Sequence, residues 1–515
     1  MSTDLISGAR ARAQSERAAN ASLAASGLAA LGVRQDDCVA IYLRNDFEFF
    51  EASAACNLLG AYATPINWHY TAQEAGYILD DCDAKVVVIH ADLLPAIASV
   101  IPAATHVVVV PLPPEIASAY RVENPAPPIP AALANRSCQW HELIAGQAPW
   151  DKPIPPQRSS MIYTSGTTGN PKGVRREPMG PEGLASQART VFEGFGIAPD
   201  CTGVRVLMTG PMYHSAPNAY GLSAARNGAM IVLQARFDAE QLLQLVDQYK
   251  ITHMHMVPTM FIRLLRLPAE VRAKYDVSSL QHVVHGAAPC PPEAKRQMIE
   301  WWGPVIFEYY GSTENGLVTV VTSEMALNKA GTVGSPIAGN VIRILDDNGQ
   351  PVPTGEIGEV YIWRPDRTNF TYHKREDARQ EMDIDGYLTN GDMGWLDADG
   401  CLFLADRKND MVISGGVNIY PAEIEKILID CPGVRDCAVF GVPHEEFGES
   451  LAAHLEISKP DVTADQVKAY LREHLAGFKV PSVIVMEASL PREDSGKIFK
   501  RKLREPYWVG VPRRI

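Results

Sequence analysis

A glycine- and hydroxyl-rich run that starts at Tyr163 has the composition of a phosphate-binding loop. It reads Tyr163-Thr-Ser-Gly-Thr-Thr-Gly-Asn-Pro-Lys-Gly173 and follows the apolar pair Met161-Ile162, as the end of a strand would. Glycines let backbone amides approach a phosphate, hydroxyls add donors, and Lys172 supplies positive charge. The run is not a Walker A loop, because Gly173 stands where Ser or Thr would be required. Taken alone, the pattern also fits an ordinary glycine-rich surface turn.

Four later stretches carry other groups suited to a nucleotide. Their positions are Phe307–Glu314, Thr389–Trp395, Asp406–Glu425 and Pro491–Lys497. The first ends in aromatic, hydroxyl and carboxylate groups, and the second holds a carboxylate in a glycine-flanked turn. The third combines basic residues, a double glycine and a helix start, and the fourth places one lysine after a glycine turn. Five such motifs in one chain favour a nucleotide site over an isolated surface turn.

Composition sets the broad class of the protein. The chain has 515 residues, of which 46% are hydrophobic and 21% charged, which is typical of a globular protein with about two to four domains. A net charge of -13 argues against a nucleic-acid partner. Nine cysteines without CxxC pairs favour reduced thiols. With no visible signal peptide and no apolar stretch of about 18 residues, we expect a cytoplasmic protein without a membrane span.

The first third of the chain alternates between strand and helix patterns. Short apolar runs at 38–43, 85–89 and 106–111 are typical of buried strands, and the patterns at 46–59 and 71–82 are typical of helices. This alternation predicts a parallel sheet covered by helices. It resumes after the glycine-rich loop and gives way to antiparallel strands and turns from about residue 332. The last hundred residues have the pattern of a separate α+β unit.

Taken together in order and spacing, the five motifs resemble the ANL superfamily of adenylate-forming enzymes. This superfamily contains acyl-CoA synthetases, adenylation domains of nonribosomal peptide synthetases and firefly-type luciferases, and the resemblance covers nearly the whole chain. His214 and the Gly-Gly-Val-Asn-Ile-Tyr-Pro run at 415–421 look most like the acyl-CoA synthetase branch. The resemblance implies two steps. A carboxylate attacks the α-phosphate of ATP to give acyl-AMP and pyrophosphate, and the thiol of CoA then displaces AMP.

The same resemblance implies the fold class, α/β. Residues 1–408 are expected to form a large N-terminal domain of helix-covered parallel sheets plus a small β-barrel-like subdomain. Residues 409–515 are expected to form a small mobile α+β domain with the catalytic lysine and the CoA passage. The usual hinge residue, Asp or Lys, aligns here with Asn409, which tolerates unusual backbone angles. The alanine-rich segment 2–31 lacks the usual strand and helix signature, so one edge of the first sheet is expected to be missing or differently built.

The resemblance assigns most of the ATP site. The β- and γ-phosphates are assigned to Thr164, Ser165, Gly166, Thr167, Thr168, Gly169 and Lys172. Tyr310 is expected to stack on the adenine, Asp392 to accept the ribose hydroxyls and Arg407 to support the ribose or a phosphate. The opposite wall and the adjoining turn are assigned to Gly286, Ala287, Ala288 and Gly311. The purely structural alternatives are a buried core role for Tyr310 and interdomain salt bridges for Asp392 and Arg407.

Catalytic roles also follow from the resemblance. Thr313 is expected to contact the α-phosphate or the adenylate, and Glu314 to bind Mg²⁺, a hard cation that prefers carboxylate oxygens. Lys497 is the candidate adenylation lysine, placed to stabilise the negative charge of the displacement. His214 is expected to line the acyl and pantetheine path as a gate, not as a general base; a satisfied core histidine is the alternative. The pair Gly415–Gly416 is expected to line the CoA tunnel.

The acid itself is less well defined by the sequence. No obvious charge apart from histidine lines the expected acyl pocket, so a mostly apolar acid is favoured: fatty, aromatic, bulky alicyclic or steroid. One alternative is a stand-alone adenylation enzyme that loads a separate carrier protein, and another is a non-catalytic nucleotide-binding protein. The expected ligands are ATP, Mg²⁺, CoA and a small carboxylic acid. The related enzymes leave a homodimer open.

Overall fold

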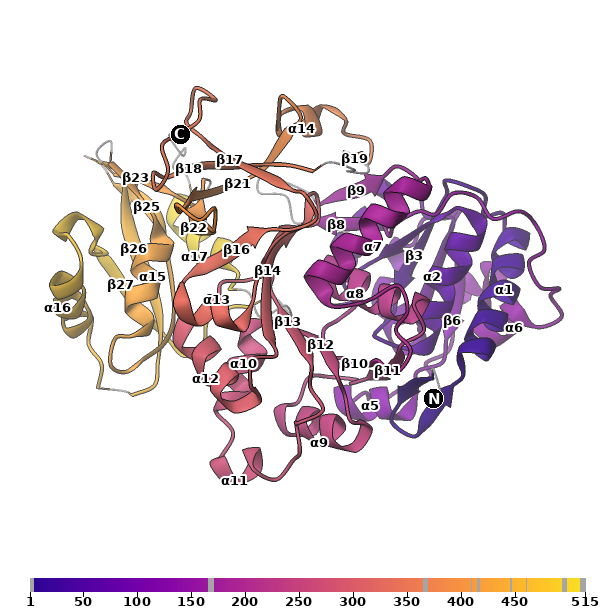
Figure 1. Ribbon diagram of the computed structural model, residues 1–515. Coiled ribbons are helices and arrows are strands. Elements are labelled where there is room, and N and C mark those ends of the chain that lie inside the picture. The colour runs from indigo at the N-terminus through magenta and orange to yellow at the C-terminus, as the bar shows by residue number, and fades with distance from the viewer. Residues whose placement is uncertain are drawn as a thin grey trace.

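The computed structural model describes residues 4–164, 171–364, 369–408, 410–414, 417–444, 447–459, 461–492 and 498–509. Figure 1 shows the N-terminal helices and strands, in indigo and purple, on one side of a long central sheet. The C-terminal strands and helices, in orange and yellow, lie on the other side. The described strands form four sheets, which are taken in turn.

The first sheet is parallel throughout. In spatial order its strands are β4 (Tyr62–Pro65), β3 (Cys38–Tyr42), β5 (Val86–His90), β6 (His106–Val110) and β7 (Ser137–Gln139). Helices α2 (Phe47–Leu59) and α3 (Ala72–Asp81) connect strands of this sheet. Every residue of β3 and β5 is buried, as expected for strands covered on both faces. The predicted parallel sheet and its strands and helices are confirmed.

The second sheet begins as a parallel sheet and continues as an antiparallel one. Its parallel strands are β1 (Leu5–Ser7), β11 (Met230–Leu233), β10 (Arg205–Met208), β12 (His253–Met256), β13 (His282–His285) and β14 (Ile306–Ser312). The antiparallel strands that follow are β15 (Gly316–Val321), β16 (Thr332–Pro336), β22 (Leu402–Arg407), β21 (Tyr387–Leu396), β18 (Gly358–Trp363) and β17 (Val341–Leu345). Two short strands, β2 (Arg10–Arg12) and β20 (Asp383–Ile384), pair with β1 and β21. The predicted antiparallel region is thus a direct extension of the parallel sheet.

The helices of this region pack around the second sheet. They are α7 (Pro181–Phe195), α8 (Ser215–Arg226), α9 (Ala239–Tyr249), α10 (Pro258–Leu265), α12 (Pro292–Trp302) and α13 (Ser323–Asn328). A third, small sheet in the order β19 (Phe370–Tyr372), β9 (Lys172–Arg176) and β8 (Ile162–Thr164) carries the two ends of the glycine-rich loop. Among the described residues, no helix is long and apolar enough to cross a membrane.

The C-terminal residues form a fourth sheet with a core of its own. Its strands are β24 (Val417–Ile419), β23 (Val412–Ser414), β26 (Gly448–Ile457), β25 (Val434–His444) and β27 (Val483–Glu487). Helices α15 (Pro421–Ile429) and α16 (Ala464–His474) bury Ile424, Leu428 and Leu471 against it. An independent core is the property that defines a domain. A small α+β C-terminal domain is therefore present, while its boundary after residue 408 stays a prediction.

The N-terminal segment is more ordered than its sequence suggested. Strands β1 and β2 and helix α1 (Gln14–Ala30) form where little strand or helix signature was visible, so the expectation of a reduced segment is wrong. Strand β1 pairs in parallel with β11 and extends the second sheet, not the first. Alanines made the segment look featureless, but small side chains also allow close helix packing: Ala21, Ala24 and Ala25 of α1 are buried.

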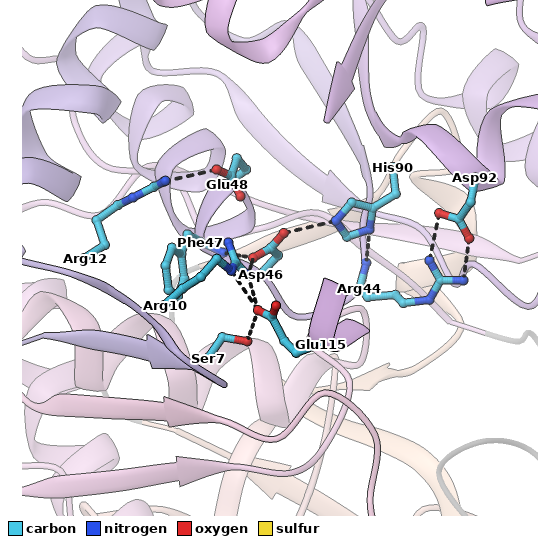
Figure 2. Close-up of polar contacts among 10 residues, drawn as sticks. All are labelled: Ser7, Arg10, Arg12, Arg44, Asp46, Phe47, Glu48, His90, Asp92 and Glu115. Atoms are coloured by element: carbon cyan, nitrogen blue, oxygen red, sulfur yellow. Dashed lines mark hydrogen bonds and ion pairs between the residues drawn. The ribbon is translucent and has the colours of Figure 1, made fainter. Parts of the chain in front are cut away.

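A buried polar network holds this segment in place. Figure 2 shows Asp46 between two basic groups: Arg10 Nη2 lies 2.6 Å from its Oδ1, and His90 Nε2 lies 3.2 Å from its Oδ2. The same arginine donates to Glu115 through Nε at 2.7 Å, and Ser7 donates to this carboxylate at 2.9 Å. Asp46 is fully buried at the start of α2. Breaking such a pair costs about 3–5 kcal/mol, so the network fixes the N-terminal hairpin to α2.

A second part of the network is less well neutralised. Arg12 Nη1 lies 3.1 Å from Glu48 and 2.8 Å from Glu51, so one guanidinium serves two carboxylates. The second carboxyl oxygens of Glu48 and Glu51 are buried, and neither has a hydrogen-bond partner among the described residues. Burial raises the pKa of Glu51 to about 7, although Arg12 opposes the shift. The folded protein therefore holds a proton on Glu51 that the unfolded chain releases at a lower pH.

Substitution of this residue tests the shifted pKa. Because the pKa of Glu51 is higher in the folded state, the free energy of unfolding should fall as the pH rises from about 4.5 to about 7, by up to about 3 kcal/mol. Glu51→Gln removes the titration, so urea unfolding at pH 5 and pH 8 should differ less for this variant than for the wild type. The exposed Glu123→Gln serves as the control and should keep the wild-type difference. An unchanged pH dependence in Glu51→Gln would contradict the assignment.

Candidate active site

The glycine-rich loop connects two paired strands. Strands β8 and β9 are antiparallel, with Thr164 opposite Lys172, so the ends of the loop lie side by side. The Tyr163 hydroxyl donates to Asp81 at 2.6 Å and fixes the first strand. The Lys172 ammonium lies 5.2 Å from the centre of the Tyr372 ring. The predicted phosphate ligands between these ends lie outside the described residues: Ser165, Gly166, Thr167, Thr168 and Gly169.

The loop meets the predicted metal ligand at its first strand. The Thr164 hydroxyl lies 3.4 Å from Oε1 of Glu314, and the Tyr372 hydroxyl donates to the same oxygen at 3.0 Å. Arg176, on the second strand, donates to the backbone carbonyls of Thr313 and Glu314. Two motifs 150 residues apart in the sequence are thereby fixed against each other. The carboxylate faces the end of the hairpin, where phosphates would lie if the loop binds them.

Tyr372 was not predicted from the sequence. It lies on β19, a three-residue strand that pairs with β9, with Tyr372 opposite Val174. Burial and the adjacent carboxylate raise the pKa of the Tyr372 hydroxyl, so it stays protonated and can donate. The alternating aromatic residues Phe370 and Tyr372 are the only local signal in the sequence. A strand this short is not distinguishable from a turn by pattern alone.

The donor chemistry at Glu314 suits Mg²⁺ together with a nucleotide. Mg²⁺ prefers oxygen ligands and is commonly bound by one or two carboxylates plus substrate phosphates and water. In the part of the chain that the structure describes, no cluster of three or more His, Cys, Asp or Glu side chains could hold a metal. A single carboxylate next to a hydroxyl is consistent with an ion that takes its remaining ligands from ATP.

The predicted adenine and ribose residues touch each other. The Tyr310 hydroxyl donates to Oδ2 of Asp392 at 2.6 Å, which joins β14 to β21. Asp392 is paired with Arg407 across β21 and β22, although nothing is described of the arginine side chain. The aromatic ring and the carboxylate are therefore held together by a hydrogen bond between β14 and β21, which lie apart in the strand order of the second sheet.

Two glycines of the predicted nucleotide wall are required by packing. A Cβ atom on Gly286 would lie 2.5 Å from the ring of Tyr309, and one on Gly311 would lie 2.1 Å from the carbonyl oxygen of Gly316. Ala287 has a φ of 69°, in the left-handed region. Gly286 is buried, whereas Ala287 and Ala288 line the cleft. Close packing therefore accounts for the absence of a side chain at both glycines. The two alanines form the accessible wall of the cleft.

His214 lies where the nucleotide wall meets helix α8. It precedes the first turn of the helix, and its ring is 4.5 Å from that of Tyr213. Burial, with a smaller effect from His214, lowers the pKa of His255 to about 3. Neutral His255 is hydrogen-bonded through Nε2 to the Tyr309 hydroxyl at 3.0 Å. His253 and His255 belong to buried strand β12, and both His214 and His255 line the cleft.

A single large cleft contains most of these side chains. Its volume is about 3620 Å³, well above the 300–1,000 Å³ of an ordinary ligand pocket. The predicted residues that line it are Thr164, Lys172, His214, Ala287, Ala288, Tyr310, Gly311, Thr313, Glu314 and Asp392. The C-terminal domain contributes further lining residues, including Phe478 and Lys500. Lys497, Gly415, Gly416 and Asn409 lie outside the described residues.

Comparison with known proteins gives the family. The model of the family described as "AMP-binding enzyme" matches residues 14–370, and that of the "AMP-binding enzyme C-terminal domain" matches residues 423–497. The chain belongs to the AMP-binding enzyme family.

Curated relatives of this AMP-binding enzyme align over almost its full length. It is 31% identical over 488 residues to the long-chain-fatty-acid–CoA ligase FadD13 of Mycobacterium tuberculosis (strain CDC 1551 / Oshkosh), with 94% of this chain and 91% of the relative covered. It is 34% identical over 494 residues, with the same coverage, to the 3-[(3aS,4S,7aS)-7a-methyl-1,5-dioxo-octahydro-1H-inden-4-yl]propanoyl:CoA ligase of M. tuberculosis (strain ATCC 25618 / H37Rv). Feruloyl-CoA synthase of Amycolatopsis sp is 31% identical over 489 residues, again covering 94% and 91%. This AMP-binding enzyme is an AMP-forming acid–thiol ligase.

Solved structures agree with the fold. The amide bond synthetase McbA from Marinactinospora thermotolerans matches with a TM-score of 0.82 at 22% identity, covering 98% of this chain and 97% of that one. O-succinylbenzoate coenzyme A synthetase (MenE) from Bacillus subtilis, solved in complex with ATP and a magnesium ion, matches with a TM-score of 0.78 at 27% identity, covering 97% and 96%. The predicted α/β fold with a large N-terminal and a small C-terminal domain is confirmed.

Basic side chains also line the cleft of this AMP-binding enzyme. Arg226, Arg263 and Arg266 belong to the wall of the large cleft that also contains the nucleotide residues. The expectation that no charge other than histidine lines the acyl pocket stays a prediction. Helix α8 continues beyond Tyr220 to Arg226, and its last turns also line the cleft. The small residues early in the helix were the local signal in the sequence, and they did not indicate that the basic residue at its end also faces the cleft.

Removal of the Tyr372 hydroxyl tests the geometry around Glu314. Tyr372→Phe should raise the KM for MgATP about tenfold, because the carboxylate loses the partner that orients it. The KM for the acid should stay within about twofold. Tyr275→Phe is the matched control, since the Tyr275 hydroxyl also donates to a carboxylate, that of Glu240, at 2.9 Å. Equal increases in both KM values would contradict an orienting role and indicate a general structural effect.

Proposed function

We propose that this enzyme is an ATP- and Mg²⁺-dependent acyl-CoA synthetase that acts on a fatty, aromatic or bulky alicyclic acid. The relatives named above are ligases for acids of these classes, and at 31–34% identity they do not fix which one is used. The acceptor is CoA, because each of these three relatives forms a CoA thioester by its name. The acid is bound along helix α8, whose cleft-lining side chains include Ala216, Ala219 and Leu222.

In the first step an oxygen of the substrate carboxylate forms a bond to the α-phosphorus of ATP. The bond from this phosphorus to the bridging oxygen breaks, and pyrophosphate leaves. Lys172 and the hydroxyls of the glycine-rich loop hold the departing phosphates, and Lys497 neutralises the charge on the α-phosphate. A Mg²⁺ ion held by Glu314 would neutralise phosphate charge. Tyr310 and Asp392 hold the adenine and the ribose.

In the second step the CoA thiolate attacks the acyl carbonyl carbon and AMP leaves. The pantetheine arm approaches past His214 and between Gly415 and Gly416, where a side chain would narrow the passage. Rotation of the C-terminal domain about Asn409 moves Lys497 away from the adenylate and brings the passage at Gly415 and Gly416 to it. His214 lines the path and transfers no proton.

The observation that carries the proposal is the junction at Glu314. The Thr164 hydroxyl, at the end of the glycine-rich loop, lies within hydrogen-bond distance of the Glu314 carboxylate, and Thr313 and the linked Tyr310 and Asp392 line the same cleft. Transfer of the adenylyl group of ATP to a carboxylate requires triphosphate, metal and nucleoside to be held together in this way.

A substrate panel tests the function directly. Purified enzyme with ATP, Mg²⁺ and CoA should release AMP with one class among fatty, aryl and alicyclic acids, and form the matching thioester. Omission of CoA should leave a slow release of pyrophosphate, and acyl carrier protein should not replace CoA. Pyrophosphate release with no acid of the panel would contradict the proposal. Transfer only to carrier protein would favour the stand-alone adenylation enzyme instead.

Replacement of Lys497 separates the two steps. Lys497→Ala should lower the rate of acyl-AMP formation by about 10²–10³, because a charge that stabilises the displacement is lost. Thioester formation from supplied acyl-AMP should change much less. Lys502→Ala, which removes an exposed lysine of the same region, should have neither effect. Equal losses in both half-reactions would be inconsistent with the role given to Lys497.

A further inference from the structure

Helix α8 lines the cleft with one face along its whole length. The lining residues are Ser215, Ala216, Pro217, Asn218, Ala219, Leu222, Ser223 and Arg226. After the first turn they recur every three or four residues, so they lie on one side of the helix. The helix has twelve residues, which corresponds to about 18 Å at 1.5 Å per residue. An acid that lies along α8 therefore has its two ends near different parts of the helix.

The start of α8 is the end near the reacting groups. His214, directly before the helix, acts electrostatically on His255, which is hydrogen-bonded to Tyr309. Tyr309 precedes Tyr310, the expected adenine-binding residue. The carboxyl group that reacts with ATP consequently belongs at this end, and the residue at the opposite end of the helix is Arg226.

Arg226 is an exposed residue of the cleft wall, and it differs from four arginines of the N-terminal domain that pair with carboxylates. Arg10, Arg12, Arg44 and Arg158 each form an ion pair with at least one carboxylate. Among the described residues, no ion pair includes Arg226. Its two terminal nitrogens instead donate to the side-chain oxygen of Gln157, at 2.7 and 2.9 Å. The guanidinium is thus hydrogen-bonded and held in position by a neutral group, and its charge is not balanced.

The Arg226 side chain is accessible from the cleft and is also partly desolvated by the surrounding protein. The side chain keeps solvent-accessible surface because it faces the cleft. Burial by the surrounding protein lowers its pKa, and no carboxylate acts on it to raise the value. Ser223, one turn earlier on the same face, adds a hydroxyl group. A cleft-facing cation without a counter-ion is open to an anion that enters the cleft, and partial desolvation strengthens the attraction between them.

We infer that the acid bound by this enzyme carries a second carboxylate, remote from the carboxyl group that reacts, and that Arg226 binds it. The inference rests on the proposed function, since it assumes that an acid lies along α8. Arginine forms paired, charge-assisted hydrogen bonds with carboxylates. Gln157 occupies one side of the guanidinium and leaves its cleft-facing donors for the substrate. The apolar middle of the helix, with Ala219 and Leu222, suits the aliphatic or alicyclic body between the two carboxyl groups.

Pairs of acids with equal length test this inference. Suberic, sebacic and dodecanedioic acids are compared with octanoic, decanoic and dodecanoic acids, and kcat/KM is measured by AMP release with CoA. The wild type should prefer the diacid in at least one pair. Arg226→Gln should lower kcat/KM for that diacid about 10- to 100-fold, as expected for loss of a charge-assisted hydrogen bond, and leave the monoacid within about twofold.

Two further variants separate charge from structure. Gln157→Glu keeps Arg226 but gives it a counter-ion within the protein, so it should also reduce the preference for the diacid. Arg189→Gln removes an exposed arginine from the neighbouring helix α7 and should leave the preference unchanged. Isothermal titration of the diacid against each purified variant, in the absence of ATP, should show the same order of affinities.

The outcomes distinguish this inference from the proposed function. Turnover of monoacids without any preference for diacids, or an equal loss for both acids in Arg226→Gln, would overturn the role of Arg226 and leave the acyl-CoA synthetase in place. A loss confined to the KM for CoA or ATP would also overturn it, because the anion bound would then be a phosphate. Failure of every acid in both panels would overturn the proposed function and the inference with it.

Discussion

The candidate active site depends on the contact between the glycine-rich hairpin and the turn that carries Glu314. Arg176 holds this turn through two backbone carbonyls, while Thr164 and Tyr372 approach its carboxylate. These groups come from strands of two different sheets, and neither sheet alone would contain a site. A carboxylate held by hydroxyl groups before its ligand arrives pays little of the ordering cost of binding. The position of the remaining nucleotide-binding residues follows from this junction, because Tyr310 lies on the strand that leads into the same turn.

The N-terminal segment supports the other end of the cleft. Arg17 of α1 donates to the carbonyl of Ala225 at 2.9 Å, next to Arg226. A cation at the last turn of a helix stabilises the helix dipole and satisfies a free carbonyl group. Helix α1 is in turn fixed to α2 through Asn20, which donates to Glu51 at 3.0 Å. The buried network of Figure 2 and its extension to Glu51 therefore stabilise the part of the fold on which the end of α8 rests.

The sequence predicted what depends on local pattern and on motifs. The parallel strands around Val86 and Val107 were recognised because both of their faces are buried, and the loop after Tyr163 was recognised by its composition. Three features depended on distant contacts instead. Tyr372 lies on a strand that is recognised only by its pairing with β9. The alanines of α1 pack closely against α2, and this role is visible only in the folded protein. Arg226 is an ordinary basic residue at a helix end until the fold places it in the cleft without an acid.

A cation without a counter-ion at the end of α8 changes how the cleft selects its substrate. A wall of alanine and leucine discriminates weakly between acids, since one methylene group changes the binding free energy by only about 1–3 kcal/mol. A site built to pair with a polar group rejects the analogue that lacks this group more strongly, because its own buried group is then left unpaired. Arg226, which is accessible from the cleft, would supply a polar partner of this kind at the end of α8. On the proposal above, selectivity depends on one cation at the end of α8 as well as on the apolar side chains of that helix.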